Sequence, residues 1–266
     1  MTAPTEELLR VTELTLRFGE LAAIGGVSFA QRGGEILALV GPNGAGKTAV
    51  LNCINGVYRP TSGSIRFGEH DVARTPLHAI AALGIGRAFQ HVELFPHMTV
   101  LDNIMIGRHI RMKTGIFGGG LYFGGARREE IAERRRAEEM IDFFELYRYR
   151  DAPAHILPYG VQKLVGVARA LALEPKLLLL DEPSTGLVRE EKENLARYLL
   201  RIKHDLGIAV LWVEHDMQMV ADLADRVIVL NYGIKIAEGP PAAVRKDSEV
   251  IKAYLGGRGT VAAAST

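Results

Sequence analysis

The stretch GPNGAGKT, Gly41 to Thr48, constrains the fold more than any other part of the chain. It fits the pattern G-x-x-x-x-G-K-[ST], with the apolar run Ile36 to Val40 before it and the helical pattern KTAVLNCI after it. A glycine-rich loop between a buried strand and a helix can turn its backbone N–H groups toward a phosphate, and the helix N-terminus adds partial positive charge. The sequence therefore predicts a nucleotide-binding loop in an α/β fold.

Individual residues of this loop have predicted roles. Lys47 is expected to reach the β- and γ-phosphates of a bound nucleotide, and the Thr48 hydroxyl can bind Mg²⁺. The other residues predicted to bind the nucleotide in this segment are Gly41, Pro42, Asn43, Gly44, Ala45, Gly46 and Ala49. The expected ligands are thus a nucleoside triphosphate and Mg²⁺.

A second motif, LLLLDE, supplies two adjacent carboxylates at residues 177 to 182. Asp181 ends a predicted buried strand and is suited to the Mg²⁺ shell, whereas Glu182 points to another side of the pleat and can orient an attacking water. Two acidic residues at a strand end are weak evidence alone. Following a phosphate-binding loop, they predict the metal and water side of a hydrolytic site.

Composition limits the classes of partner. The 266 residues are 48% hydrophobic and carry 32 basic against 31 acidic residues, a formal net charge of +1. A sizeable core is expected, and no charge excess favours nucleic acid or an anionic membrane. Cys53 is the single cysteine, and the sequence has neither an apolar signal-peptide core at its start nor a run of about 18 apolar residues. We expect a cytoplasmic protein that reaches a membrane only through another chain.

The order of apolar patterns predicts a mainly parallel, doubly wound sheet. Antiparallel strands are expected near the N-terminus, a mostly helical segment from about Thr99 to Leu173, and then strands alternating with helices. The helix REEKENLARYLLRIKH should bury Leu195, Leu199 and Ile202 on one face. The glycine-rich segment from Gly115 to Gly125 is expected to be a surface connection; alternatively, its apolar residues contact a partner, namely Phe117, Leu121, Tyr122 and Phe123.

Further motifs appear in a fixed order along the chain. They are GRAFQ with Gln90, LPYGVQ from Leu157 followed by ARAL, EPSTGL after the acidic strand, and WVEH with His215. Together with the two motifs above, they resemble the nucleotide-binding subunits of ABC transporters from about Leu9 to Leu255. The resemblance implies a single ATP-binding domain over residues 1–266. Its fold would be a P-loop NTPase (RecA-like) parallel-sheet core, with an N-terminal antiparallel β subdomain and a helical subdomain inserted at about 95–173.

The resemblance also implies catalytic roles. Asp181 matches the acid that organises Mg²⁺, and Glu182 matches the general base for hydrolysis of ATP. Gln90 would touch Mg²⁺ and the attacking water while sensing a membrane partner, and His215 would contact the γ-phosphate. Phe18 matches the aromatic residue that stacks on adenine, with ordinary packing as the alternative.

Two segments depart from the family pattern. The signature loop is commonly L-S-G-G-Q, but here it reads Leu157-Pro158-Tyr159-Gly160-Val161, and Val188 replaces an acidic or amide residue. Tyr159 and Gly160 are nevertheless predicted to contact ATP that is bound by a second subunit. Because Pro158 lacks both a hydroxyl and an N–H, recognition should depend on the following backbone N–H groups and on the helix dipole. The departures could weaken the dimer or indicate that the second subunit is a different chain.

The order of motifs resembles most the ATPases of branched-chain (hydrophobic) amino-acid importers. The implied partners are a second ATP-binding subunit in a homo- or heterodimer, transmembrane permease subunits, and indirectly an extracytoplasmic solute-binding protein. The chain would then lie at the cytoplasmic face of the inner membrane, held there by the permease. ATPases for urea, aromatic-acid or lipopolysaccharide transport are the alternatives within transport. A soluble ABC ATPase acting on ribosomes or DNA, and a regulatory subunit without turnover, are the others.

Overall fold

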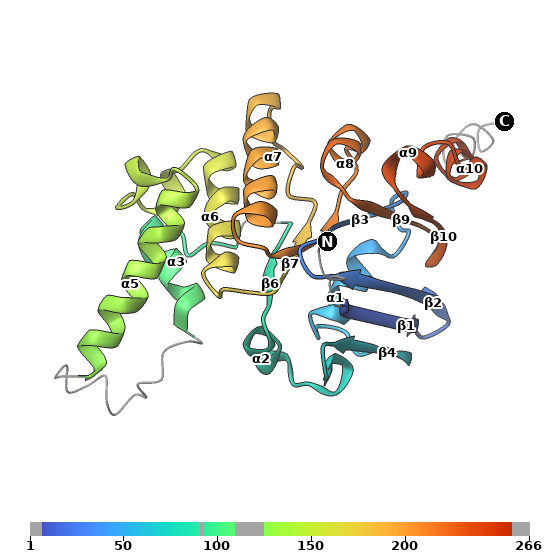
Figure 1. Ribbon diagram of the computed structural model, residues 1–266, viewed down its shortest axis with the longest axis horizontal. Helices are drawn as coiled ribbons and strands as arrows, with labels where there is room; N and C mark the ends of the chain where they lie inside the picture. The colour runs from blue at the N-terminus through green and yellow to red at the C-terminus, as the bar shows by residue number, and fades with distance from the viewer. Residues whose placement is uncertain (1–6, 91–92, 110–124, 257–266) are drawn as a thin grey trace, which may run out of the picture.

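The central feature of the computed structural model is a six-stranded sheet with helices beside it (Figure 1). The structure describes residues 7–90, 93–109 and 125–256. The strand order is β10-β9-β3-β8-β7-β6, and all pairs are parallel except β10 with β9. The strands are β3 (Ile36–Val40), β6 (Ile85–Ala88), β7 (Leu177–Asp181), β8 (Ala209–Val213), β9 (Arg226–Asn231) and β10 (Ile234–Gly239). The predicted mainly parallel sheet is thus confirmed.

A second sheet is antiparallel, as predicted, and is formed by the N-terminal part of the chain. Its order is β2-β1-β4-β5. The strands are β1 (Glu7–Phe18), β2 (Leu21–Arg32), β4 (Ser62–Phe67) and β5 (His70–Asp71). In Figure 1 it lies beside β9 and β10, with α1 (Lys47–Ile54) close to it.

The helices lie in two groups. The first group lies between β6 and β7 in the sequence and beside the parallel sheet in Figure 1, and it contains α3 (Val100–Arg108), α5 (Gly125–Phe143) and α6 (Tyr159–Leu171). The short helix α2 (Leu77–Ile80) precedes β6. The later helices are α7 (Arg189–His204), α8 (Met217–Leu223), α9 (Pro241–Val244) and α10 (Ser248–Gly256). Short 3₁₀ turns occupy 72–74, 81–83, 147–149 and 154–156. Most of the predicted glycine-rich connection, including Phe117, Leu121, Tyr122 and Phe123, lies outside the described residues.

The parallel sheet separates two hydrophobic cores. In β3, Ile36, Ala38 and Val40 pack with the helices on one side, whereas Leu37 and Leu39 pack with α1 and the antiparallel sheet on the other. Neighbouring side chains of a strand point to opposite faces, so a strand covered on both faces must be apolar at every position. This explains why ILALV and LLLL read as continuous apolar runs.

Parallel pairing also brings the functional loops together. Because β3 pairs with β8, and β8 with β7, the carboxyl ends of these three strands lie at the same edge. In such sheets ligands bind at the carboxyl edge. The loops that begin at Gly41, Glu182 and Glu214 therefore meet there. Within the described residues, no helix is both long and apolar enough to cross a bilayer.

We predict that the buried face of α7 contributes most of the stability that this helix provides. Leu199 is fully buried and its neighbour Leu200 is 37% exposed on the same helix. Leu199→Ala should lower the free energy of unfolding by about 2–5 kcal/mol, since it removes buried methyl groups and leaves a cavity. Leu200→Ala makes the same chemical change at the surface and should cost less than about 1 kcal/mol. Denaturant unfolding measures both, and equal losses would contradict the assignment of the buried face.

Candidate nucleotide-binding site

The phosphate-binding loop is held in a shape that requires glycine. Gly41 and Gly46 have φ of 152° and 96°. A Cβ on Gly41 would lie 2.1 Å from the carbonyl oxygen of Leu230, and one on Gly46 would lie 2.6 Å from that of Ala23. A Cβ on Gly44 would meet nothing within 4 Å. The loop thus packs closely on β9 and β2 but leaves open space on its other side.

The helix after the loop begins without a side-chain cap. Gly46 is the N-cap of α1, and no described side chain accepts a hydrogen bond from the first turn. Uncapped N–H groups and the partial positive charge at a helix N-terminus together suit an anion. The loop therefore fits a nucleotide phosphate by its backbone geometry.

Lys47 lies beneath the loop. Its ammonium group donates hydrogen bonds of 2.9 Å to the carbonyl oxygens of Gly41 and Pro42, and its side chain is largely buried. Burial lowers the pKa of Lys47, while Glu182 and Asp181 nearby oppose that shift. A desolvated cation held by two neutral acceptors gains from an approaching phosphate, which can offer full negative charge.

A cleft of about 460 Å³ opens above the loop. It is lined by Leu21, Ala22, Ala23, Asn43, Gly44, Ala45, Gly46, Lys47, Thr48, Ala49, Glu182 and Tyr232. Seven of the predicted nucleotide-binding residues, from Asn43 to Ala49, and Glu182 therefore share one cavity. The antiparallel sheet and Tyr232 form its outer wall.

Phe18 ends β1 near this cleft without lining it. Its ring is 47% exposed and contacts Tyr58 edge to face, with the two ring centroids 5.2 Å apart. Tyr232 lines the cleft instead and is 85% exposed. It has a φ of 46°, in the turn between β9 and β10. The sequence analysis missed Tyr232; a lone tyrosine before a glycine gave no signal beyond that of a hairpin turn.

Asp181 is held by two groups that come from different elements. Thr48 Oγ1 donates to Asp181 Oδ1 at 3.2 Å, and Arg87 donates to Oδ2 at 3.1 Å. Arg87 also donates to Asn52 Oδ1 at 2.6 Å. Burial raises the pKa of Asp181, and the charge of Arg87 opposes that shift. Thr48 and Asp181, each predicted to bind Mg²⁺, thus lie in contact, whereas the sequence analysis gave Arg87 no role.

The Glu182 carboxylate contacts two other side chains that were predicted to be catalytic, those of Gln90 and His215. Gln90 Nε2 donates to Glu182 Oε2 at 2.9 Å, and His215 Nε2 is in hydrogen-bond contact with Glu182 Oε1. These three residues come from the loops after β6, β7 and β8. The structure thus brings Gln90, Glu182 and His215 together beside the cleft, although they lie far apart in sequence.

The turn that carries His215 depends on a buried carboxylate. Glu214 is almost fully buried, and its Oε1 accepts from the N–H groups of His215 at 2.9 Å and Asp216 at 3.3 Å. Its Oε2 accepts from Trp212 Nε1 at 3.2 Å. Glu214 therefore fixes the backbone position from which the His215 side chain extends. The sequence motif WVEH contained it, but the sequence analysis assigned it no role.

The signature loop is partly exposed and partly packed within the chain. Pro158 and Tyr159 are exposed at the start of α6, and no described side chain caps that helix. Gly160 is buried: a Cβ there would lie 2.2 Å from Glu191 Oε1 of α7. Glu191 in turn accepts from the Val188 N–H at 3.0 Å. The first turn of α6 thus has no side-chain cap, while Gly160 allows close packing against Glu191.

We predict different effects for two glycines of α6. A Cβ on Gly166 would meet nothing within 4 Å. Gly166→Ala should therefore stabilise the chain by about 0.5–1 kcal/mol through helix propensity. Gly160→Ala gains the same propensity but displaces Glu191 from the start of α7, so it should be about 1–2 kcal/mol less stable than Gly166→Ala. Thermal or urea unfolding gives the comparison, and equal stabilities would show that Glu191 moves aside freely.

Comparisons with known proteins agree with this arrangement. A family model described as ABC transporter matches residues 24–185, and one described as branched-chain amino acid ATP-binding cassette transporter matches residues 235–260. The chain is 39% identical over 252 residues to the high-affinity branched-chain amino acid transport ATP-binding protein LivG of Salmonella typhimurium. That alignment covers 95% of this chain and 99% of the relative.

Two solved structures are also similar. The ADP conformation of MJ1267, an ATP-binding cassette of an ABC transporter, superposes with a TM-score of 0.82 and 31% identity, covering 95% of this chain and all of that chain. A dimeric post-hydrolysis state of the cassette MJ0796, bound to ADP and Pi, superposes with a TM-score of 0.74 and 26% identity. It covers 88% of this chain and 99% of that chain.

Proposed function

Because this chain belongs to the ABC transporter family and is an ATPase, we propose that it drives an importer of branched-chain or other hydrophobic amino acids. The observation that carries the chemistry is the position of Glu182, held between Gln90 and His215 beside the phosphate-binding loop. The solute class is supported by the C-terminal family match and by the similarity to LivG. Urea, aromatic acids and lipopolysaccharide remain the competing cargoes.

The proposed roles of the site residues are supported by where these residues lie. The loop from Gly41 to Ala49 would cradle the phosphates of ATP, with Lys47 on the β- and γ-phosphates. Thr48 and Asp181 would hold Mg²⁺, with Gln90 as a further oxygen ligand; the ion would neutralise charge that develops on the phosphates. Glu182 would take a proton from the attacking water, and His215 would contact the γ-phosphate. Phe18 would stack on adenine at the mouth of the cleft.

We propose that hydrolysis requires a second ATP-binding subunit. The start of α6 has no side-chain cap, so its first N–H groups and its partial positive charge suit an anion. In a head-to-tail dimer, with either a second copy of this chain or a different chain, Tyr159 and these N–H groups would cap ATP bound by the partner subunit. The dimeric state of the similar cassette MJ0796 supports the pairing of two such subunits. Hydrolysis would remove the shared ligand and favour opening.

The proposed permease contact is a groove of about 230 Å³ between α6 and α7. Phe89, the neighbour of Gln90, lines it together with Arg148 and Tyr149. A transmembrane subunit seated there would reach the loop that carries Gln90, and so the site of hydrolysis. We infer that residues from about 95 to 173 form a helical subdomain that presents this groove, and that the permease holds the chain at the cytoplasmic face of the membrane. An extracytoplasmic solute-binding protein would act indirectly, through the permease.

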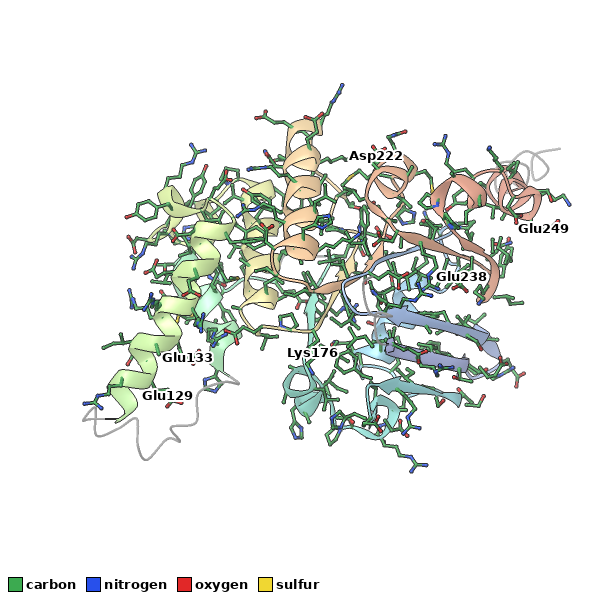
Figure 2. All side chains as sticks on the ribbon, in the orientation of Figure 1. Glu129, Glu133, Lys176, Asp222, Glu238 and Glu249 are labelled. Carbon is green, nitrogen blue, oxygen red and sulfur yellow. The ribbon has the colours of Figure 1, made fainter. Side chains whose placement is uncertain are left out.

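We expect Glu182→Gln to separate binding from turnover. The amide keeps the size of the side chain but cannot accept the proton, so kcat should fall by about 10²-fold or more while ATP binding persists. Glu249→Gln, an exposed carboxylate on α10 that Figure 2 labels, is the matched control and should retain full activity. Phosphate release and equilibrium ATP binding give the two measurements. Full hydrolysis by Glu182→Gln would disprove the assignment of the base.

A second experiment tests the groove. Arg148→Glu should reduce co-purification with co-expressed permease subunits, because it reverses a charge in the groove. The basal ATPase rate of the isolated chain should remain unchanged. Arg10→Glu is the control, because Arg10 is exposed on β1 and does not line the groove.

Vesicles that contain the assembled complex test the cargo. ATP-driven uptake of labelled leucine supports the proposal, and uptake of urea alone contradicts it.

A further inference from the structure

Lys163 directs a buried ammonium group at the turn that follows β7. The residue lies in the second turn of α6 and is 9% exposed. Its Nζ donates to three backbone carbonyl oxygens, those of Glu182 at 3.3 Å, Pro183 at 3.1 Å and Thr185 at 2.7 Å. A lysine ammonium has three donors, so all of its hydrogen-bonding capacity is directed to this one turn.

The backbone of that turn is strained at Glu182. Its φ is 48°, in the left-handed region that non-glycine residues rarely adopt. Such a conformation persists when the surrounding structure over-determines it. The Glu182 N–H donates to the carbonyl oxygen of Val213 at 3.0 Å, and the Glu182 carbonyl oxygen accepts from Lys163. The peptide groups on both sides of the Glu182 Cα are therefore fixed.

This restraint decides where the carboxylate of Glu182 lies. With its backbone held on both sides, the side chain extends to Gln90 and His215 and lines the cleft above the phosphate loop. A relaxed φ would turn the Cα–Cβ bond and move the carboxylate away from this cleft. The hydrogen bonds of the Lys163 ammonium group go to the backbone of this turn, and none goes to the carboxylate of Glu182.

We propose that Lys163 is a positioning residue for Glu182, which keeps the turn after β7 in the conformation that aims the carboxylate at the cleft. The inference rests on the proposed role of Glu182 as the general base. Lys163 also belongs to the helix whose first turn would face ATP in the partner subunit. Lys163 thereby connects the proposed general base, which acts on ATP bound by its own subunit, with the helix that would contact ATP bound by the partner subunit.

Enzyme kinetics and ATP binding together test this role. Lys163→Met keeps the length of the side chain and removes the ammonium group. We expect kcat to fall about ten-fold or more, with the dissociation constant of a fluorescent ATP analogue within about two-fold of the unmodified chain. Lys163→Arg keeps the charge and several donors and should recover part of kcat. Lys176→Met makes the same chemical change at the opposite end of β7, where Figure 2 labels Lys176, and should change neither value.

A double-mutant cycle with Glu182→Gln distinguishes positioning from general stabilisation. If Lys163 acts through Glu182, Lys163→Met should add little to the loss of kcat already caused by Glu182→Gln. Multiplied losses in the double variant would overturn the inference, as would full kcat in Lys163→Met or loss of ATP binding by it. Full activity of Glu182→Gln alone would instead disprove the proposed role of Glu182 as the general base. The experiments use the complete chain throughout.

Discussion

Parallel pairing of β3 with β8 and of β8 with β7 is the constraint on which the site depends. Consecutive parallel strands end at one edge, and each ends in a loop with its own chemistry. The register places Asp181 beside Val213, so the acidic pair of one loop and the histidine loop of the next begin at the same level. A one-residue slip would exchange the faces of Asp181 and Leu180 and bury a charge in the core. The apolar runs that fill both cores therefore also fix the geometry of the site.

Much of the site could be predicted because its chemistry is local in sequence. The phosphate loop contains its own glycines, lysine and threonine, and the flanking strand and helix have clear patterns. Gln90, Glu182 and His215 could be grouped only through resemblance to a family, and the structure brings them together. No periodicity in the sequence would have joined them, since each lies in a different loop.

The residues that the sequence analysis missed act through tertiary contacts. Arg87 lies in the motif GRAFQ and looks like any strand residue until β6 places it against Asp181. Lys163 has an ordinary place in an amphipathic helix, yet its ammonium ends on the backbone of another segment. Tyr232 marks a hairpin by sequence and forms a wall of the cleft in space. A long side chain that contacts another element produces no local pattern in the sequence, so its partner can be identified only from the fold.

The unusual signature loop is accommodated within the subunit by its neighbours. The ring of Tyr159 lies so close to Gly186 that a Cβ there would be 2.9 Å from Tyr159 Cε1. Gly186 has a φ of 80°, so this position favours glycine for two reasons. Val188 cannot cap α7 with its side chain, and Glu191 binds its N–H instead. Because the same Glu191 fills the space beside Gly160, the two departures from the family pattern meet at one carboxylate. The signature loop and the start of α7 therefore form one packed unit, and a change in either alters the surface that the subunit presents.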